Sequence, residues 1–182
     1  MRIPNFIKIS YDGQRLPDAA IEWAAVELPE HGLMFSAASI TPPNGVAPYE
    51  CDEPAGDLVL AGFNDWRLPS INELALLVDH ARFNPAIDTN YFPATYTDWY
   101  WSCTPTAWDP NGRWYVDFHY GDAAADGGMS HGHALAVRST STKNARQDAG
   151  FVTCSGCGNS DPESRCIGCR HDFGGYRAGA AP

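Results

Sequence analysis

The clearest periodic pattern in the chain predicts an amphipathic helix over residues 70–81. Ser70 and Glu73 have the spacing of a capping box, in which the serine hydroxyl accepts a hydrogen bond from a free amide of the first turn and the glutamate reaches back to the cap. Apolar residues then recur at helical spacing, at Ile71, Leu74, Leu77, Val78 and Ala81. Asn84 and Pro85 end the pattern, because the residue before a proline disfavours helical backbone.

A hairpin is predicted ahead of this helix. Apolar runs in residues 20–35 flank a Pro-Glu-His-Gly turn at 29–32, which is typical of two strands joined by a tight turn. The alanine-rich part of the first run also fits a helical turn. Residues 46–61 leave the type of element open, because Pro48 and Pro54 interrupt any long helix.

A period of two replaces the helical period after residue 99. It predicts strands at 100–103 and 113–120, joined by a turn at 108–112 whose Asn-Gly pair supplies the positive φ angles that hairpins need. Residues 121–132 are rich in Gly, Ala and Asp and are expected to form a loop. Residues 134–138 are expected to form the last short strand.

Together these elements predict an α+β domain of short strands, one amphipathic helix and long loops. Strands and helices do not alternate in the βαβ manner, so a parallel doubly wound sheet is not expected. The composition agrees with this fold class. The 182 residues include 17 glycines and 14 prolines, which favour loops, and six tryptophans, whose side chains can pin ordered loops in place.

The charge of the chain excludes two classes of partner. The net charge is −10, and the acidic excess lies in residues 1–138, so the body is not expected to bind nucleic acid or anionic lipid. No stretch approaches the roughly 20 apolar residues of a membrane span, so membrane insertion is not expected. Residues 1–10 lack the apolar region of a secretory signal, which predicts synthesis in the cytoplasm.

A change in composition divides the chain near residue 139. The domain described above is expected to occupy residues 1–139, followed by a polar linker at 140–150. A cysteine-rich segment follows at 151–175, and residues 176–182 form a Gly/Ala tail that is expected to be flexible.

The cysteine-rich segment has the spacing of a metal site. Cys154 and Cys157 form one Cys-x-x-Cys pair, and Cys166 and Cys169 form a second. Four thiolates arranged in this way predict a closed, structural zinc site, and zinc binding would supply the folding energy of a segment with almost no apolar core. Two disulfides or an iron–sulfur cluster are the alternatives.

The strand predicted at 113–120 also suggests a ligand-binding face. Aromatic rings stack on sugars or on protein side chains, while polar groups fix the orientation of a ligand. The candidate residues on this strand and the loops beside it are Trp108, Asn111, Tyr115, Asp117, His119 and His131. The alternative is that this face packs beneath a loop.

Enzymatic and calcium-dependent functions are not expected. Residues 128–132 match the Gly-x-Ser-x-Gly pattern of hydrolases, but the apolar strand before it and the helix after it are missing. Four aspartates in the same region offer oxygen ligands for calcium, namely Asp109, Asp117, Asp122 and Asp126. They lack EF-hand spacing, so calcium is not the expected cofactor.

Residues 62–74, which read GFNDWRLPSINEL, resemble the "DWRLP…EL" signature of the Lcl C-terminal domain family. Shorter pieces resemble other parts of that family in the same order, at 32–35, 49–51, 92–93, 100–102 and 136–138. The resemblance covers roughly residues 10–139. It implies a fold similar to C-type lectins and to formylglycine-generating enzymes, with a small antiparallel sheet, one or two helices and long loops. It also implies a role in adhesion or glycan binding, and similar lectin-like domains occur at the tips of phage tail proteins.

The residues of the signature themselves indicate a structural role. Trp66 and Leu68 are expected in the core, and Arg67 and Asp65 are expected to pair with each other or to bond backbone near the helix start. The family usually carries a cysteine at the position of Ala136, so Cys51 lacks its usual partner. Cys51 and Cys103 are therefore expected to be free thiols.

The sequence thus favours a non-enzymatic binding module that recognises a host-surface glycan or protein. A phage tail tip or an adhesin fits a lectin-like body without a signal segment, and the location would then be the virion, with other tail proteins as partners. A homo-oligomer is compatible with this role, although no heptad pattern supports one. The alternatives are a structural virion component without its own ligand, or a cytoplasmic enzyme or regulator with a zinc-bound tail.

Overall fold

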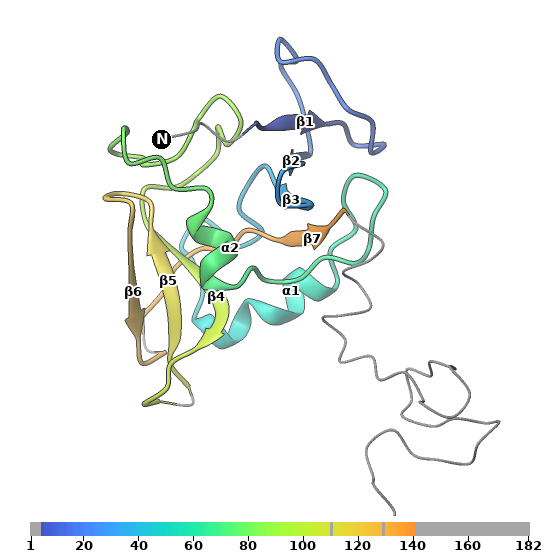
Figure 1. Ribbon diagram of the computed structural model, residues 1–182. Helices are drawn as coiled ribbons and strands as arrows, with labels where there is room; N and C mark the ends of the chain where they lie inside the picture. Colours follow the sequence, from blue (N-terminus) through green and yellow to red (C-terminus); the bar gives the residue numbers. More distant parts are fainter. Residues whose placement is uncertain (1–4, 110, 129, 141–182) are drawn as a thin grey trace, which may run out of the picture. The chain divides into compact units, whose positions relative to one another are not determined.

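Two antiparallel sheets form the framework of the domain in the computed structural model, which describes residues 5–140 except 110 and 129. The first sheet has the order β1-β2-β3-β7 and the second the order β4-β5-β6 (Figure 1). The strands of the first sheet are β1 (Ile7–Ile9), β2 (Ala25–Leu28), β3 (Leu33–Ser36) and β7 (Val137–Ser139). Those of the second are β4 (Trp99–Pro105), β5 (Arg113–Asp117) and β6 (Asp122–Asp126).

Short helices occupy the long connection from β3 of the first sheet to β4 of the second. The 3-10 turn η1 (Pro48–Glu50) leads into α1 (Asp52–Gly56), and α2 (Ile71–Ala75) precedes the second sheet. This mostly-sheet architecture with two small α-helices is consistent with the predicted α+β class. Within the described part of the chain, no helix is long and apolar enough to cross a membrane.

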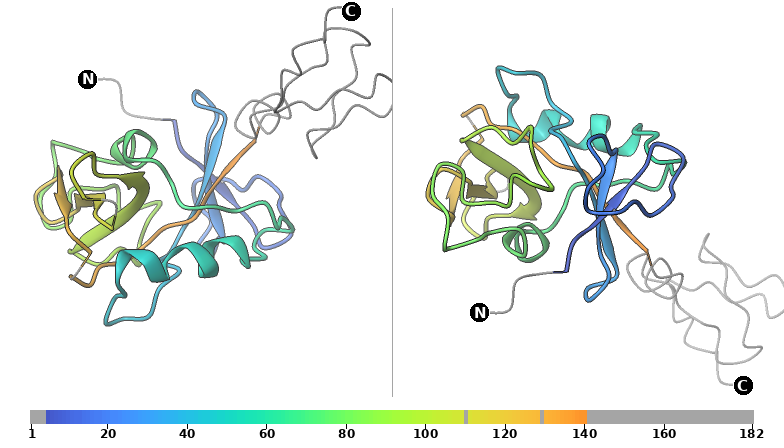
Figure 2. Two further views of the ribbon diagram at one scale, coloured as in Figure 1. Left: turned by 90° about the horizontal axis from the view of Figure 1, so that it is seen from below. Right: turned by 90° about the horizontal axis from the view of Figure 1, so that it is seen from above.

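One segment joins the two sheets. His133 exchanges backbone hydrogen bonds with Trp99 and Trp101 of β4, and a few residues later β7 pairs with β3. Figure 2 shows this segment running from one sheet to the other. The main core contains side chains of both sheets, among them Phe35 and Tyr100, and is completed by Val137 of β7.

The hairpin predicted in residues 20–35 is confirmed as β2 and β3. Their register pairs Ala25 with Ser36 and Leu28 with Leu33 across a turn at 29–32. Alternate side chains enter different clusters, because successive residues of a strand point to opposite faces. The alanine-rich part before residue 25 lies outside the strand.

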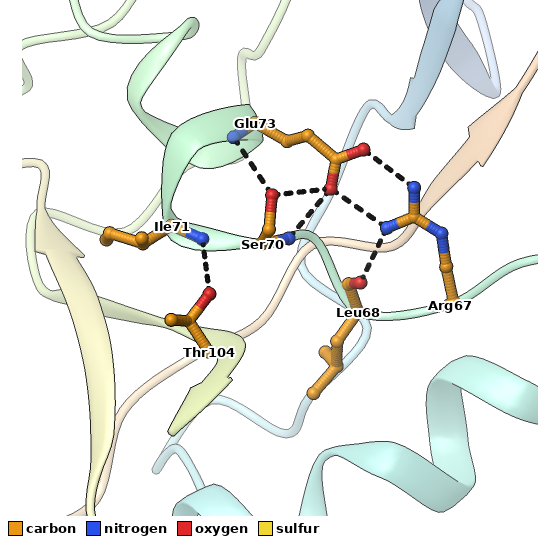
Figure 3. A network of polar contacts seen from close by, with 6 residues as sticks. All are labelled: Arg67, Leu68, Ser70, Ile71, Glu73 and Thr104. Carbon is orange, nitrogen blue, oxygen red and sulfur yellow. Dashed lines mark hydrogen bonds and ion pairs between the residues drawn. The ribbon is translucent and has the colours of Figure 1, made fainter. Parts of the chain in front are cut away.

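The capping box at the start of α2 is also confirmed (Figure 3). The Ser70 hydroxyl accepts a hydrogen bond from the Glu73 amide at 3.3 Å, and Glu73 accepts one from the Ser70 amide at 2.8 Å. Arg67 donates to both carboxylate oxygens of Glu73, at 2.9 and 2.6 Å. Burial would raise the pKa of Glu73, but the hydrogen bonds from Arg67 and Ser70 hold it below its ordinary value.

The predicted length of this helix is wrong, because α2 ends at Ala75 and not near residue 81. After Leu74 the backbone hydrogen bonds join residues three apart, as in a 3-10 helix. An example is the bond from the Leu77 amide to the Leu74 carbonyl. Leu77 is nevertheless buried in the main core. The apolar spacing therefore identified the core-facing side chains as far as Val78, but Ala81 is exposed and the run of helical backbone was overestimated.

The second sheet corrects three further expectations. Residues 122–126, expected in a loop, form β6 and pair with β5 along its whole length. Gly121, with a φ of +82°, reverses the chain sharply enough for this pairing, which overrides the weak strand propensity of alanine. Strand β5 ends at Asp117 and not at residue 120, and Gly112 does not adopt the positive φ expected of an Asn-Gly turn.

The tryptophan and leucine of the sequence signature are buried as expected, at 3% exposure each for Trp66 and Leu68. Of the two roles expected for Asp65 and Arg67, bonding to backbone near the helix start is confirmed for Arg67, which donates to the Leu68 carbonyl at 3.1 Å, whereas their mutual pairing is wrong. Asp65 instead pairs with Arg138, at 2.6 Å, while Arg67 pairs with Glu73 and exchanges backbone bonds with Val137. The signature thus ties the start of α2 to the edge of β7.

Candidate ligand-binding surfaces

An exposed tryptophan lies in the turn that joins β4 to β5. Trp108 is 69% exposed, and its ring meets that of Trp114 edge-to-face with centroids 6.0 Å apart. Asn111 in the same turn is also exposed. Its backbone amide donates a hydrogen bond to the Asp109 side chain at 2.9 Å. Gly128 lies against the Asn111 carbonyl, so a Cβ at Gly128 would come within 2.9 Å of that oxygen. We call the surface formed by Trp108, Asn111 and Trp114 the hairpin end.

Asp117 and His119, two other predicted residues, lie at the far end of β5 and just beyond it. Asp117 accepts a hydrogen bond from the His119 amide at 2.7 Å and so supports the turn after β5. The His119 ring contacts Phe83 and Tyr120, with centroids 5.0 and 4.3 Å away. Strand β5 spans roughly 13 Å at about 3.3 Å per residue, so these residues are too far from Trp108 to share a small ligand.

Tyr115 packs inside the domain. It is 8% exposed, stacks on Trp99 with centroids 4.3 Å apart and meets the edge of Trp101. At Tyr115 the predicted ligand-binding face therefore packs against other side chains of the domain and is not open to a ligand. His131 is exposed in the segment after β6. The six candidate residues are thus not brought together in one site.

The described residues 5–140, apart from 110 and 129, contain no group of three or more His, Cys, Asp or Glu side chains that could hold a metal ion. The four cysteines of the predicted zinc site, and the linker and tail around them, lie outside the described residues. Their assignment stays a prediction.

The two cysteines of the domain are free thiols. Cys51 is buried, and its burial raises the pKa of the thiol to about 12, so it is protonated at neutral pH. Cys103 is exposed and lies on β4. Neither thiol has the lowered pKa of a reactive cysteine.

A cleft of about 690 Å³ opens on the other sheet, where residues 18–23 face residues 88–91. Its walls include the half-buried rings of Trp23 and Tyr91, and Lys8 of β1 lies beneath them. Polar side chains, including Asp18, Asp88 and Asn90, also line it. We call this site the Trp23–Tyr91 cleft.

The cleft could not be identified from the sequence. Its residues come from three separate segments, and β1, which contributes Lys8, was not predicted. The available signal was a lysine between two isoleucines at 7–9, a pattern typical of a strand, with a tryptophan and a tyrosine outside the predicted elements. Nothing in the sequence indicated that these residues meet.

Comparison with known proteins identifies the family of this domain. The Lcl C-terminal domain family matches residues 30–138, which is more than half of the chain. The protein belongs to the Lcl C-terminal domain family. No curated protein matches the chain. The matched part of this Lcl C-terminal domain includes the hairpin end and Tyr91, whereas Lys8 and Trp23 precede it.

Proposed function

We propose that this Lcl C-terminal domain is a recognition module of a surface-exposed assembly, an adhesin or a phage tail tip, and that it contacts a glycan or protein on a host cell. The observation that carries the proposal is the exposure of Trp108. An indole left in water forgoes the favourable free energy of burial, and tryptophan is enriched among the residues that dominate binding energy at interfaces. Its ring contacts that of Trp114 on one side, which lowers the cost of ordering it when a partner binds.

Family membership supports this role without assigning a ligand. The Lcl C-terminal domain family is not a known enzyme family, and its members lean towards surface-associated adhesion. A phage tail location, with other tail proteins as partners, is the finer part of the proposal. It is supported by the resemblance to lectin-like domains at tail tips.

Binding of the full chain to intact bacterial cells tests the proposal. We expect the protein to co-sediment with host cells, and Trp108→Ala to weaken this binding at least tenfold, as for a hot-spot residue. Tyr49→Ala is the matched control because Tyr49 is an aromatic residue of similar exposure, 68%, on η1. Equal binding by Trp108→Ala and the unaltered protein would remove the hairpin end from the proposal. Absence of cell binding, with the protein found in purified virions, would favour a structural component.

For the cysteine-rich segment we propose one structural zinc ion held by Cys154, Cys157, Cys166 and Cys169. Its support is the paired Cys-x-x-Cys spacing. Metal analysis of the purified chain should find about one zinc per chain, lost in a Cys154→Ser/Cys157→Ser variant. Protein free of zinc and iron, with a mass corresponding to two disulfides, would contradict the metal site.

A further inference from the structure

We propose that the Trp23–Tyr91 cleft binds an uncharged saccharide. The site extends the recognition role to a second surface, separate from the hairpin end, so either surface can fail without the other. The proposal rests on the volume of the cleft, on its fixed aromatic walls and on the distribution of charge along its floor and rim.

The aromatic walls are held in place before any ligand arrives. The Trp23 indole donates a hydrogen bond to the Tyr91 carbonyl at 2.8 Å, which ties the two walls together. The Tyr91 ring packs on Phe6, with centroids 5.2 Å apart, and its hydroxyl donates to Asp18 at 3.2 Å. Rigid aromatic rings suit the apolar faces of pyranose sugars, because stacking then costs little conformational entropy.

The Lys8 ammonium, which lies beneath the cleft, already makes its contacts within the protein. The Lys8 ammonium donates to the carbonyl oxygens of Asp18 and Ala20, both at 2.8 Å, and lies 3.7 Å from the centroid of the Trp23 ring. Lys8 is only 6% exposed. Its role is to fix the 18–23 segment and the indole, so it is poorly placed to pair with a carboxylate or sulfate group of a ligand.

The rim offers hydrogen-bond acceptors that also carry negative charge. Asp88 accepts bonds from the Asn90 amide and side chain, both at 3.0 Å, and pairs with Arg82 at 3.0 Å. The Asp18 carboxylate accepts one bond from Tyr91 and has further lone pairs for hydroxyl donors. Carboxylates at the rim of a protein with a net charge of −10 repel sulfated and sialylated glycans.

Uncharged saccharides match this combination. They present apolar ring faces to aromatic walls and many hydroxyl donors to carboxylate acceptors. The volume of about 690 Å³ lies within the usual range of small-molecule sites. A cationic ligand would suit the rim, but it would approach the buried Lys8 charge, which disfavours it.

Saturation-transfer NMR on the full chain tests the proposal directly. The uncharged probes are glucose, galactose, mannose, N-acetylglucosamine and lactose, and the charged probes are sialyllactose, a sulfated chondroitin disaccharide and spermidine. We expect transfer to at least one uncharged probe at concentrations up to about 10 mM, a range that detects millimolar affinity. Transfer to charged probes alone, or to none, would overturn the proposal.

Variants then locate the binding site. Tyr91→Ala removes one wall and should abolish detectable transfer. Asn90→Ala, an exposed change that leaves the walls intact, should weaken affinity several-fold and guards against misfolding of the first variant. Phe83→Ala is the matched control, because Phe83 is an aromatic residue 65% exposed that contacts His119 and Tyr120 away from the cleft.

The results separate this site from the hairpin end. Binding of an uncharged saccharide that survives both Tyr91→Ala and Asn90→Ala would place the sugar elsewhere and overturn the assignment of the cleft. Loss of cell binding in Trp108→Ala with no saccharide binding would leave the recognition role standing without the cleft. Trp108→Ala is expected to bind the saccharide as the unaltered protein does.

Discussion

The hairpin end and the Trp23–Tyr91 cleft present aromatic side chains to solvent in different ways. At the hairpin end, Trp108 projects into water and is supported from one side by Trp114. In the cleft, Trp23 and Tyr91 are half-buried, tied together by a hydrogen bond and accompanied by carboxylates and an amide. An open ring needs a partner that brings its own complementary surface, whereas a walled cleft supplies polar partners to a small ligand.

An exposed aromatic ring and an enclosed pair of rings thus indicate different kinds of partner within one domain. The hairpin end suits a macromolecular surface, and the cleft suits a saccharide unit. Four changes would break or sharpen the contrast, the first with the largest expected effect.

Replacing Lys8 with methionine should damage the cleft most. The change leaves the carbonyl oxygens of Asp18 and Ala20 without their donor and removes the cation from the Trp23 ring. We expect a loss of about 2–3 kcal/mol in the free energy of unfolding, measured by urea denaturation, together with loss of saccharide binding.

Lys8→Arg is the control for this change, since it keeps the charge and should retain part of both properties. Cell binding through Trp108 should persist in either variant under conditions where the protein stays folded. A Lys8→Met protein of unchanged stability would show that the ammonium does not organise the cleft.

Replacing Glu73 with glutamine should weaken the scaffold that both surfaces share. The lowered pKa of Glu73 means that its contribution to stability is present above the ordinary glutamate pKa and is lost as the pH falls through the lowered value. We expect a loss of about 1 kcal/mol at pH 7, because Arg67 is partly exposed, and a flatter acid limb in the dependence of stability on pH. Affinities at both surfaces should stay the same.

Protonation of His133 should weaken the domain at a higher pH than protonation of Glu73. Burial lowers the pKa of His133, with the Asp98 charge acting in the opposite direction, so the unfolded chain binds the proton more readily. Stability should therefore fall as the pH drops below about 6.5, by no more than about 1.4 kcal/mol per pH unit for one proton. Thermal melts of a His133→Asn variant between pH 5 and 7 should lack this slope, and an identical slope would assign it to another group.

Replacing Tyr91 with phenylalanine should have the smallest effect. It removes only the exposed hydrogen bond to Asp18 and keeps the aromatic wall. We expect stability within about 0.5 kcal/mol of the unaltered protein and a saccharide affinity reduced a few-fold at most. A loss as large as that of Tyr91→Ala would mean that the hydroxyl, and not the ring, dominates binding.

The sequence predicted those parts of the fold that depend on neighbouring residues. The capping box needs only Ser70 and Glu73, and the β2–β3 hairpin needs a turn between two apolar runs, so both were recognisable. Strand β6 was missed because its three central alanines have weak strand propensity and gain their conformation from pairing with β5. The end of α2 was missed because an apolar stripe continues through residues that have left the helix.

The candidate surfaces show the same division. Trp108 and Asn111 were identified from a local turn, and the structure places them together. Tyr115 was assigned to a polar face because of strand alternation, but stacking on Trp99 is a contact between strands that the sequence of β5 does not reveal. The cleft depends entirely on such distant contacts, as in the hydrogen bond between Trp23 and Tyr91, 68 residues apart.

The segment before β7 has a consequence for how the domain is made. The Ala136 amide bonds to the Ser36 hydroxyl, 100 residues earlier, and Val137 completes a core that begins with Phe6. Contacts this far apart in sequence slow folding, because a long stretch of chain must be ordered before they form. A nascent chain halted before residue 137 would thus lack the strand that closes its first sheet, and the shortest fragment worth expressing ends after β7.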